Sequence, residues 1–139
     1  MKVTFTVEGK PIGKGRPKFG IRNGRVNART PDATVLYENF VRLSYQNQCG
    51  YRFPDDAPLK MEIDSFYQIP ASESNKRKEL MRANTIRPTK TPDCDNVLKA
   101  IADSLQGIAY RDDKNIVECI IRKYYSDVAR INVEISDIV

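Results

Sequence analysis

The sequence predicts a single α/β (α+β) domain in which about two to three helices pack against a mixed β-sheet. The chain has 139 residues, the usual length of one domain, so we expect residues 1–139 to form it. Hydrophobic residues make up 40% and charged residues 29%, an ordinary globular balance. Segments with strand-like alternation are interleaved with segments of helical spacing, which predicts both element types but no strand order.

The N-terminal part predicts a strand, a loop and a helix. Residues 2–8 alternate apolar and polar side chains, as a half-buried strand does. Residues 9–24 are predicted to be a glycine-rich basic loop. Thr30 and Pro31 suit the N-cap and the first position of a helix, which should run to residue 48. Its inward face is expected to carry Ala33, Leu36, Tyr37, Phe40, Val41 and Ser44.

The middle of the chain predicts a second strand and an exposed helix. Residues 59–67 alternate apolar with polar side chains. Residues 72–83 are charged and lack a strong apolar face, so a helix there would lie in solvent. Residues 87–92 form a basic connector to the next element.

The C-terminal part predicts a core helix and two strands. The helix covers residues 93–106 and ends at Gly107, a residue type common just past a helix. The strands cover residues 116–125 and 130–135, and the turn between them predicts a C-terminal antiparallel β-hairpin.

Several function classes are excluded by residue types and patterns. The chain has no histidine, which excludes Ser-His-Asp and Cys-His catalysis and any histidine-held metal. Cys49, Cys94 and Cys119 are widely spaced, so neither a disulfide framework nor a zinc site is expected, and Cys94 should pack against the sheet. No stretch approaches the roughly 18 apolar residues of a membrane helix. With no signal-peptide pattern either, we expect a cytoplasmic protein that does not associate with membranes.

Carboxylates concentrate where the core helix and the following strand begin. Asp93 and Asp95 lie at the helix N-terminus, and Asp112 and Asp113 lie just before the strand. Two carboxylates about 4 Å apart repel by roughly 4 kcal/mol at an effective dielectric constant near 20, and a divalent cation offsets this repulsion. Oxygen ligands alone favour Mg²⁺, with Mn²⁺ as a substitute. Helix capping and simple solvation remain the alternative interpretation.

Positive charge gathers in two loop-rich segments. Residues 10–29 contain seven Lys or Arg and no acidic residue, and residues 72–90 contain six against two. Each run alone is typical of a solvated face, but two runs flanking an acidic site favour a phosphate backbone as partner, as does the net charge of +5. The expected DNA contacts are Lys14, Arg16, Lys18, Lys76, Arg77, Lys78, Arg87 and Lys90.

The run from Thr91 to Leu105 resembles the signature of the RusA-type Holliday junction resolvases, which are endodeoxyribonucleases of bacteria and their prophages. The run reads Thr-Pro-Asp-Cys-Asp-Asn-Val-Leu-Lys-Ala-Ile-Ala-Asp-Ser-Leu. The family's order also places an early Gly-Arg-Pro-Lys stretch at 15–18 and the double aspartate after the signature, so the resemblance covers nearly the whole chain.

The resemblance implies a Mg²⁺-dependent homodimer that binds four-way DNA junctions and makes paired nicks. It places the catalytic residues at Asp93, Asp95, Asp113 and Lys99. The implied metal ligands are Asp93, Asp95 and one of the pair Asp112 and Asp113, a choice that variable spacing in the family leaves open.

The resulting hypothesis is metal-assisted phosphodiester hydrolysis, with Lys99 near the phosphate or the attacking water and Asp103 as its i,i+4 partner. One alternative is a non-catalytic nucleic-acid-binding module, and another is a nuclease for flap DNA, other branched DNA or RNA. Nicking that needs Mg²⁺ and stops with EDTA would separate a nuclease from a binding module. The first strand and the C-terminal hairpin are candidates for the dimer surface.

Overall fold

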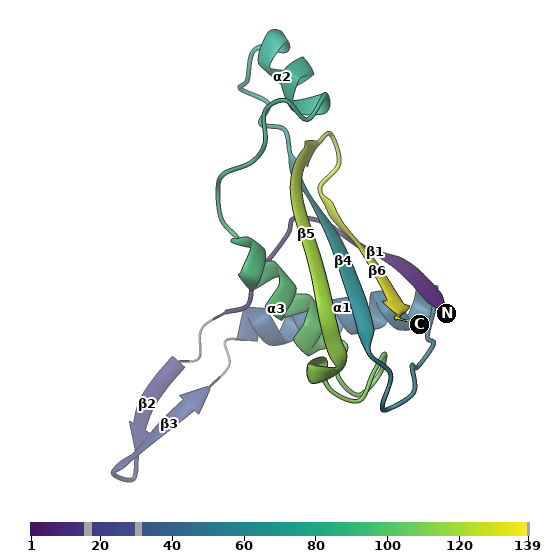
Figure 1. Ribbon diagram of the computed structural model, residues 1–139. Coiled ribbons are helices and arrows are strands. Elements are labelled where there is room, and N and C mark those ends of the chain that lie inside the picture. Colours follow the sequence, from purple (N-terminus) through teal and green to yellow (C-terminus); the bar gives the residue numbers. More distant parts are fainter. Residues whose placement is uncertain (16–17, 30–31, 139) are drawn as a thin grey trace.

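The computed structural model describes residues 1–15, 18–29 and 32–138, and a mixed four-stranded sheet forms its centre. The sheet has the order β1-β6-β4-β5 (Figure 1). Its strands are β1 (Lys2–Glu8), β4 (Leu59–Gln68), β5 (Ile116–Ser126) and β6 (Arg130–Asp137). Strands β4 and β5 are parallel, whereas β6 is antiparallel to both β1 and β4. The predicted fold class, a mixed sheet packed by helices, is confirmed.

Three α-helices and one 3₁₀-helix accompany the sheet. They are α1 (Asp32–Gln48), α2 (Asn75–Arg82), α3 (Cys94–Ser104) and the 3₁₀-helix η1 (Asp113–Asn115). Figure 1 shows α2 beyond one end of the sheet. This helix lies within residues 72–83, for which the sequence predicts an exposed helix. The proposed cap residues of the first helix, Thr30 and Pro31, lie outside the described residues. In the described ranges, no helix has both the length and the apolar character needed to cross a membrane.

The core lies between one face of the sheet and the helices α1 and α3. Alternate residues of the strands point into it because successive strand side chains face opposite ways. Each fully buried aliphatic side chain contributes about 1.5–3 kcal/mol relative to its exposed state. The strands supply Val3, Phe5, Val7, Leu59, Met61, Ile63, Ile131, Val133 and Ile135, and the helices supply Tyr37, Val41, Tyr45, Val97, Ala100 and Ile101.

The predicted inward face of α1 is partly wrong. Tyr37 and Val41 are buried as expected, but Leu36 is 70% exposed and Phe40 is 43% exposed. The buried positions of α1 are Thr34, Tyr37, Val41 and Tyr45. The helix thus carries apolar residues on two faces, and the core covers one of them. Periodicity alone does not separate two adjoining apolar faces.

The predicted C-terminal hairpin is also corrected. Both strands form where expected, but β4 lies between them, so β5 and β6 do not pair with each other. The connection 127–129 therefore crosses the end of one strand, a separation of about 9.6 Å between β5 and β6. The four Cα steps from Ser126 to Arg130 can span about 13 Å, which is sufficient. Strand formation follows from alternation, whereas strand order does not.

The predicted loop at 9–24 is partly wrong, because its end contains the first strand and the turn of a second, two-stranded sheet. Strands β2 (Lys18–Arg22) and β3 (Arg25–Arg29) pair antiparallel, and Figure 1 shows this hairpin projecting away from the main sheet. Asn23 and Gly24 connect the strands with φ angles of 54° and 73°. Positive φ at both central residues characterises a type I′ turn, for which Asn-Gly is a preferred pair. This dipeptide was the missed sequence signal.

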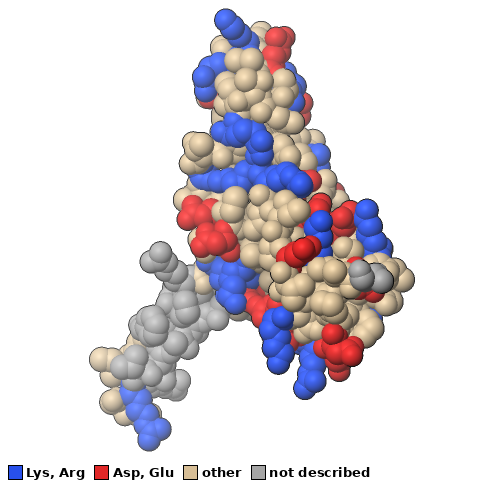
Figure 2. Space-filling model, in the orientation of Figure 1, with Lys and Arg blue, Asp and Glu red and all other residues tan. Residues whose placement is uncertain are grey.

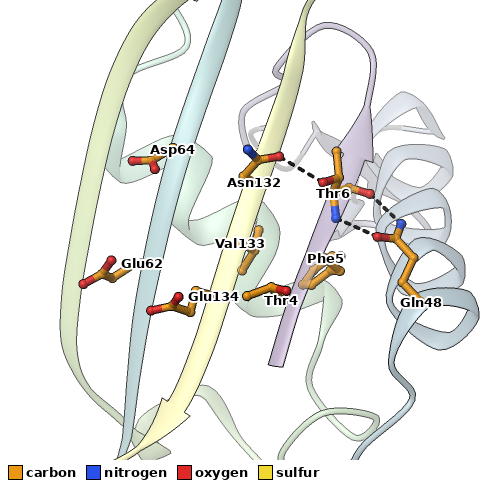
Figure 3. A pocket seen from close by; sticks show the side chains of 9 residues that line it. All are labelled: Thr4, Phe5, Thr6, Gln48, Glu62, Asp64, Asn132, Val133 and Glu134. Atoms are coloured by element: carbon orange, nitrogen blue, oxygen red, sulfur yellow. Dashed lines mark hydrogen bonds between the residues drawn. The ribbon is translucent and has the colours of Figure 1, made fainter. Parts of the chain in front are cut away.

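The face of the sheet opposite the core residues is polar, as Figure 3 shows. It lines a pocket of about 370 Å³ with the side chains of Thr4, Thr6, Glu62, Asp64, Asn132 and Glu134. The carboxylates there have cationic neighbours: Lys2 Nζ lies 3.1 Å from Glu134 Oε1, and Arg122 Nη1 lies 3.3 Å from Asp64 Oδ1. We call this surface the polar sheet face.

Candidate active site

The N-terminus of α3 presents two exposed carboxylates. Asp93 is the N-cap residue and has extended backbone, but its side chain makes no capping hydrogen bond. Asp95 follows in the first helical turn. Negative charge is favoured here because the backbone N–H groups of the first turn point toward it. Capping by a side-chain hydrogen bond therefore does not account for Asp93.

Asp95 and Asp113 line one pocket together with Lys99. This pocket, which we call the acidic pocket, has a volume of about 240 Å³. Its other lining residues are Leu98, Ala102, Ile116 and Cys119. The beginning of α3 and the segment before β5 thus each contribute one of the four predicted carboxylates to this pocket. Asp93 and Asp112 do not line this pocket.

The two neighbouring aspartates of η1 have different environments. Asp112 is the N-cap residue of η1, and its carboxylate accepts a hydrogen bond of 3.0 Å from the Lys114 backbone N–H. This bond lowers the pKa of Asp112. Burial, followed by a hydrogen bond with Asp112, raises the pKa of Asp113. Asp113 therefore lies in a setting where added positive charge would be stabilising.

Lys99 lies between two carboxylates. Its Nζ atom is 3.0 Å from Asp103 Oδ1 and 3.5 Å from Asp113 Oδ2. The hydrogen bond to Asp103 raises the pKa of Lys99, so its ammonium stays protonated at neutral pH. The predicted i,i+4 pair of Lys99 and Asp103 is confirmed.

Lys14 holds the segment before β2 against α3. Its Nζ atom lies 2.5 Å from Glu38 Oε1 and 3.1 Å from Asp103 Oδ2, and its side chain is 25% exposed. Its backbone N–H also donates to the Asn96 carbonyl at 3.1 Å. Burial opposes the charge of Lys14, but the hydrogen bonds to Glu38 and Asp103 outweigh it and raise its pKa. These contacts give Lys14 a positioning role next to the acidic pocket.

Close packing explains the glycine beside Lys14. A Cβ atom on Gly13 would lie 2.9 Å from the Cβ atoms of both Pro92 and Asn96. Real Cβ atoms essentially never come this close, so a larger residue would push the loop away from the start of α3.

The other predicted DNA contacts are distributed over two regions. On α2, Lys76 and Arg77 are exposed and Lys78 is half-buried, and the Arg77 Nε atom lies 2.7 Å from Glu73 Oε2. Arg87 and Lys90 lie in the connector before α3, each beside an aromatic ring. Arg16 and the side chain of Lys18 lie outside the described part of the chain.

The acidic residues fit a divalent cation by their chemistry. Within the described residues, no three His, Cys, Asp or Glu side chains already form a metal-binding group. Asp95 and Asp113 place carboxylate oxygens in one pocket, and burial of Asp113 disfavours its negative charge. Mg²⁺ is commonly held by one or two carboxylates, with water and substrate phosphate supplying the other ligands. Two carboxylates in one pocket meet that requirement.

The structure contradicts the prediction for Cys94 and adds Tyr67 to the residues around the site. Cys94 is exposed, so the expectation that it packs against the sheet is wrong, because the N-terminal turn of α3 extends past the core. Tyr67 of β4 was missed: its hydroxyl donates to the Pro92 carbonyl at 2.7 Å, directly before Asp93. A tyrosine at the end of an alternating strand carries no signal for such a role.

Comparison with known proteins identifies relatives of the whole chain. Residues 8–136 match the family model described as "Endodeoxyribonuclease RusA". The chain is also 34% identical over 138 residues to "Uncharacterized protein YqaN" of Bacillus subtilis (strain 168), an alignment that covers 98% of this chain and 96% of the relative. Both alignments include α3, η1 and the acidic pocket between them.

Proposed function

The chain belongs to the RusA family of endodeoxyribonucleases, and from this premise we propose that it is a Mg²⁺-dependent enzyme that resolves Holliday junctions in the cytoplasm by paired, symmetric nicking. Family membership supports phosphodiester hydrolysis of DNA. The observation that carries the rest is the acidic pocket, in which Asp95, Lys99 and Asp113 meet on a protein of net charge +5. A polyanionic substrate and an acidic pocket fit together when a divalent cation lies between them.

The proposed roles follow from where each side chain lies. Asp95 and Asp113 hold the cation from two sides of the acidic pocket, and Asp93 joins them from the exposed N-cap of α3. Between Asp112 and Asp113, the geometry favours Asp113 as the ligand because Asp112 caps η1. When bound, Mg²⁺, or Mn²⁺ in its place, supplies Lewis acidity at the scissile phosphate. Lys99 binds a phosphate oxygen and orients the strand for attack by water.

We also propose that the enzyme is a homodimer, since symmetric nicks need two active sites related by a two-fold axis. The sequence offers the first strand and the C-terminal strands as the dimer surface, but their apolar residues, such as Phe5 and Ile131, are buried in the core. The outer face of α1 is available instead. Its side chains of Leu36, Phe40 and Leu43 recur at i, i+4 and i+7 and are 70%, 43% and 54% exposed.

This outer face of α1 suits a second copy of the same chain. Its apolar side chains form a continuous stripe, since residues three and four apart lie on one face of a helix. Two copies related by an axis near Phe40 would bring Leu36 of each against Leu43 of the other. Helix α1 also packs on α3, so this arrangement connects the interface to the helix that carries Asp95.

Substitution of the pocket carboxylates tests the proposal. We expect Asp95→Asn and Asp113→Asn each to slow Mg²⁺-dependent cleavage of an end-labelled four-way junction by about 100-fold or more. Binding of the junction in EDTA should not weaken. Both variants keep the pocket shape, and the loss of one negative charge does not oppose binding of a polyanion. The measurement pairs single-turnover cleavage with an equilibrium binding assay.

Two control variants sharpen this test. Asp112→Asn should cleave at nearly the wild-type rate, because an asparagine can still cap η1. Asp56→Asn changes an exposed carboxylate near Lys114 and Asn115 that does not line the acidic pocket, and it should have no effect. Wild-type cleavage by Asp95→Asn would contradict the assignment of the acidic pocket.

The choice of substrate separates the remaining candidates. A flap-directed or RNA-directed nuclease would use the same carboxylates, so flap DNA, linear duplex DNA and RNA are compared with the four-way junction. A non-catalytic binding module would bind these substrates without cleaving any of them in Mg²⁺ or Mn²⁺.

A further inference from the structure

Basic and aromatic side chains gather where β4 and β5 end. In Figure 2, Lys and Arg side chains form a band across the molecule below the lobe that contains α2. The Arg87 guanidinium lies 4.2 Å from the centre of the Tyr124 ring, and the Arg130 guanidinium lies 4.0 Å from that of Phe66. Such contacts orient cationic side chains over the ring faces.

A pocket opens at this end of the sheet. It has a volume of about 330 Å³, and we call it the Lys90 pocket. Its lining includes Lys10, Tyr67, Gln68, Lys90 and Thr91.

The aromatic ring of Tyr67 brings two ammonium groups together at this pocket. Lys90 Nζ and Lys123 Nζ lie 5.9 Å and 5.1 Å from the centre of that ring. Lys90 Nζ also lies 5.6 Å from the centre of the Tyr125 ring. Lys123 Nζ donates to the Lys90 carbonyl at 2.5 Å, which fixes the position of Lys123 relative to the connector.

Among the described residues, the two lysines that line this pocket and the neighbouring Lys123 have no counter-ion. In the described part of the chain, Lys10, Lys90 and Lys123 have no carboxylate within 4.0 Å. Some cations elsewhere are paired, namely Lys2, Lys14, Arg52, Lys60, Arg77, Arg82, Lys99 and Arg122. Others, such as Lys76, Lys78 and Lys114, also lack a carboxylate within this distance, so the pocket is distinguished by its cations lying close to one aromatic ring. Ammonium groups gathered on one ring repel each other, and a bound anion would remove that repulsion.

The pocket is connected to the acidic residues by a short stretch of chain. Thr91 lines the pocket, Pro92 follows, and Asp93 is the N-cap of α3. Two residues of extended chain span about 7 Å at most. Tyr67 strengthens this link because its ring lies beside Lys90 and its hydroxyl holds the Pro92 carbonyl at 2.7 Å.

We propose that the Lys90 pocket is a phosphate subsite, which binds a phosphate of the DNA strand near the one that is cleaved. Lys10, Lys90 and Lys123 contact the phosphate, and Tyr67 is a positioning residue that sets Lys90 and Lys123 relative to Asp93. The inference rests on the proposed function for the identity of the ligand, DNA. It adds Lys10, which lines the pocket, and Lys123, which lies beside the Tyr67 ring, and both residues lie outside the signature in sequence.

Binding in the absence of metal tests the subsite apart from catalysis. A fluorescent four-way junction is titrated with wild-type protein, Lys90→Ala, Lys123→Ala and Lys60→Ala in EDTA at several salt concentrations. Each lost phosphate contact should lower the slope of log affinity against log salt by about 0.9 and weaken affinity about threefold near physiological salt. Lys60→Ala removes the same charge from a side chain that pairs with Glu62, with Nζ 3.2 Å from Oε1, and should keep the wild-type slope.

The outcomes separate this inference from the proposed function. Reduced slopes in Lys90→Ala and Lys123→Ala, with a wild-type slope in Lys60→Ala, support the subsite. Equal slopes in all four proteins overturn it, whether or not the wild type cleaves junctions. Cleavage by the wild type in Mg²⁺ is scored separately, so a protein that binds through the pocket without cleaving would contradict the proposed function alone.

Discussion

Asp103 holds two lysines that approach it from different parts of the chain. Lys99 reaches it from the preceding turn of α3, and Lys14 reaches it from the basic loop. Burial disfavours the charge of Asp103, but the hydrogen bonds from Lys99 and Lys14 outweigh burial and lower its pKa. This one carboxylate therefore positions Lys99 at the acidic pocket and holds the segment that carries Lys14 against α3.

Replacement of Asp103 should produce a pH-dependent loss of stability. Because the folded-state pKa is lowered, the carboxylate stabilises the fold above its ordinary pKa of 3.8, and this contribution is lost as pH falls through the lower folded value. We expect Asp103→Asn to reduce the free energy of unfolding by about 1 kcal/mol at pH 7. The difference from wild type should disappear in strong acid. Urea unfolding across pH, with Asp56→Asn as control, measures it.

At the residue scale, local sequence pattern predicted positions on α3 well. The i,i+4 spacing predicts the pair of Lys99 and Asp103, and the structure shows this pair. The ion pair of Lys14 with Glu38 could not be predicted, because it joins a loop to a helix through tertiary packing. The same is true of Lys123 and Tyr67, which meet because β4 and β5 are parallel neighbours.

The β2–β3 hairpin is an element that the basic, glycine-rich composition of its segment does not predict. Its pairing is encoded locally by Asn23 and Gly24, the residue types that a type I′ turn favours. Basic composition alone favours a solvated loop and gives no indication of strand pairing. Helix boundaries were closer: α3 covers Cys94–Ser104, within the predicted 93–106.

Substitution at the turn should affect this hairpin locally. Gly24 has a φ of 73°, so Gly24→Ala should destabilise the hairpin by about 1 kcal/mol. Amide hydrogen exchange should accelerate across β2 and β3, while the melting temperature of the whole protein stays unchanged. Gly20→Ala is the control, since Gly20 has no strained φ and a Cβ there meets no atom within 4 Å. A fall of several degrees in melting temperature for Gly24→Ala would contradict a local effect.

At the scale of the whole molecule, strand order decides where the functional residues meet. The parallel pairing of β5 beside β4 places Lys123 near Tyr67 and leads the chain from η1 past α3. Alternation predicted these strands but cannot specify neighbours, since any strand with one apolar face can pair with another. The mixed sheet was therefore predicted, whereas the position of β4 between β5 and β6 was not.

The proposed dimer depends on the exposed apolar face of α1. Phe40→Glu would place a charge at the centre of that interface, so we expect the dimer dissociation constant to rise about thirtyfold, equivalent to roughly 2 kcal/mol. Light scattering coupled to size-exclusion chromatography measures the change. Gln46→Glu adds the same charge to an exposed position outside the stripe and should leave the dimer intact. A dimer that survives Phe40→Glu would locate the interface elsewhere.

The most direct measurement is to map cleavage of a four-way DNA junction labelled on each strand in turn, using wild-type protein with Mg²⁺ and with EDTA. The account predicts nicks at symmetric positions in two opposing strands with Mg²⁺, and intact junctions bound by the protein in EDTA. Junctions that are bound but left uncut in both Mg²⁺ and Mn²⁺, or cut equally in EDTA, would contradict it.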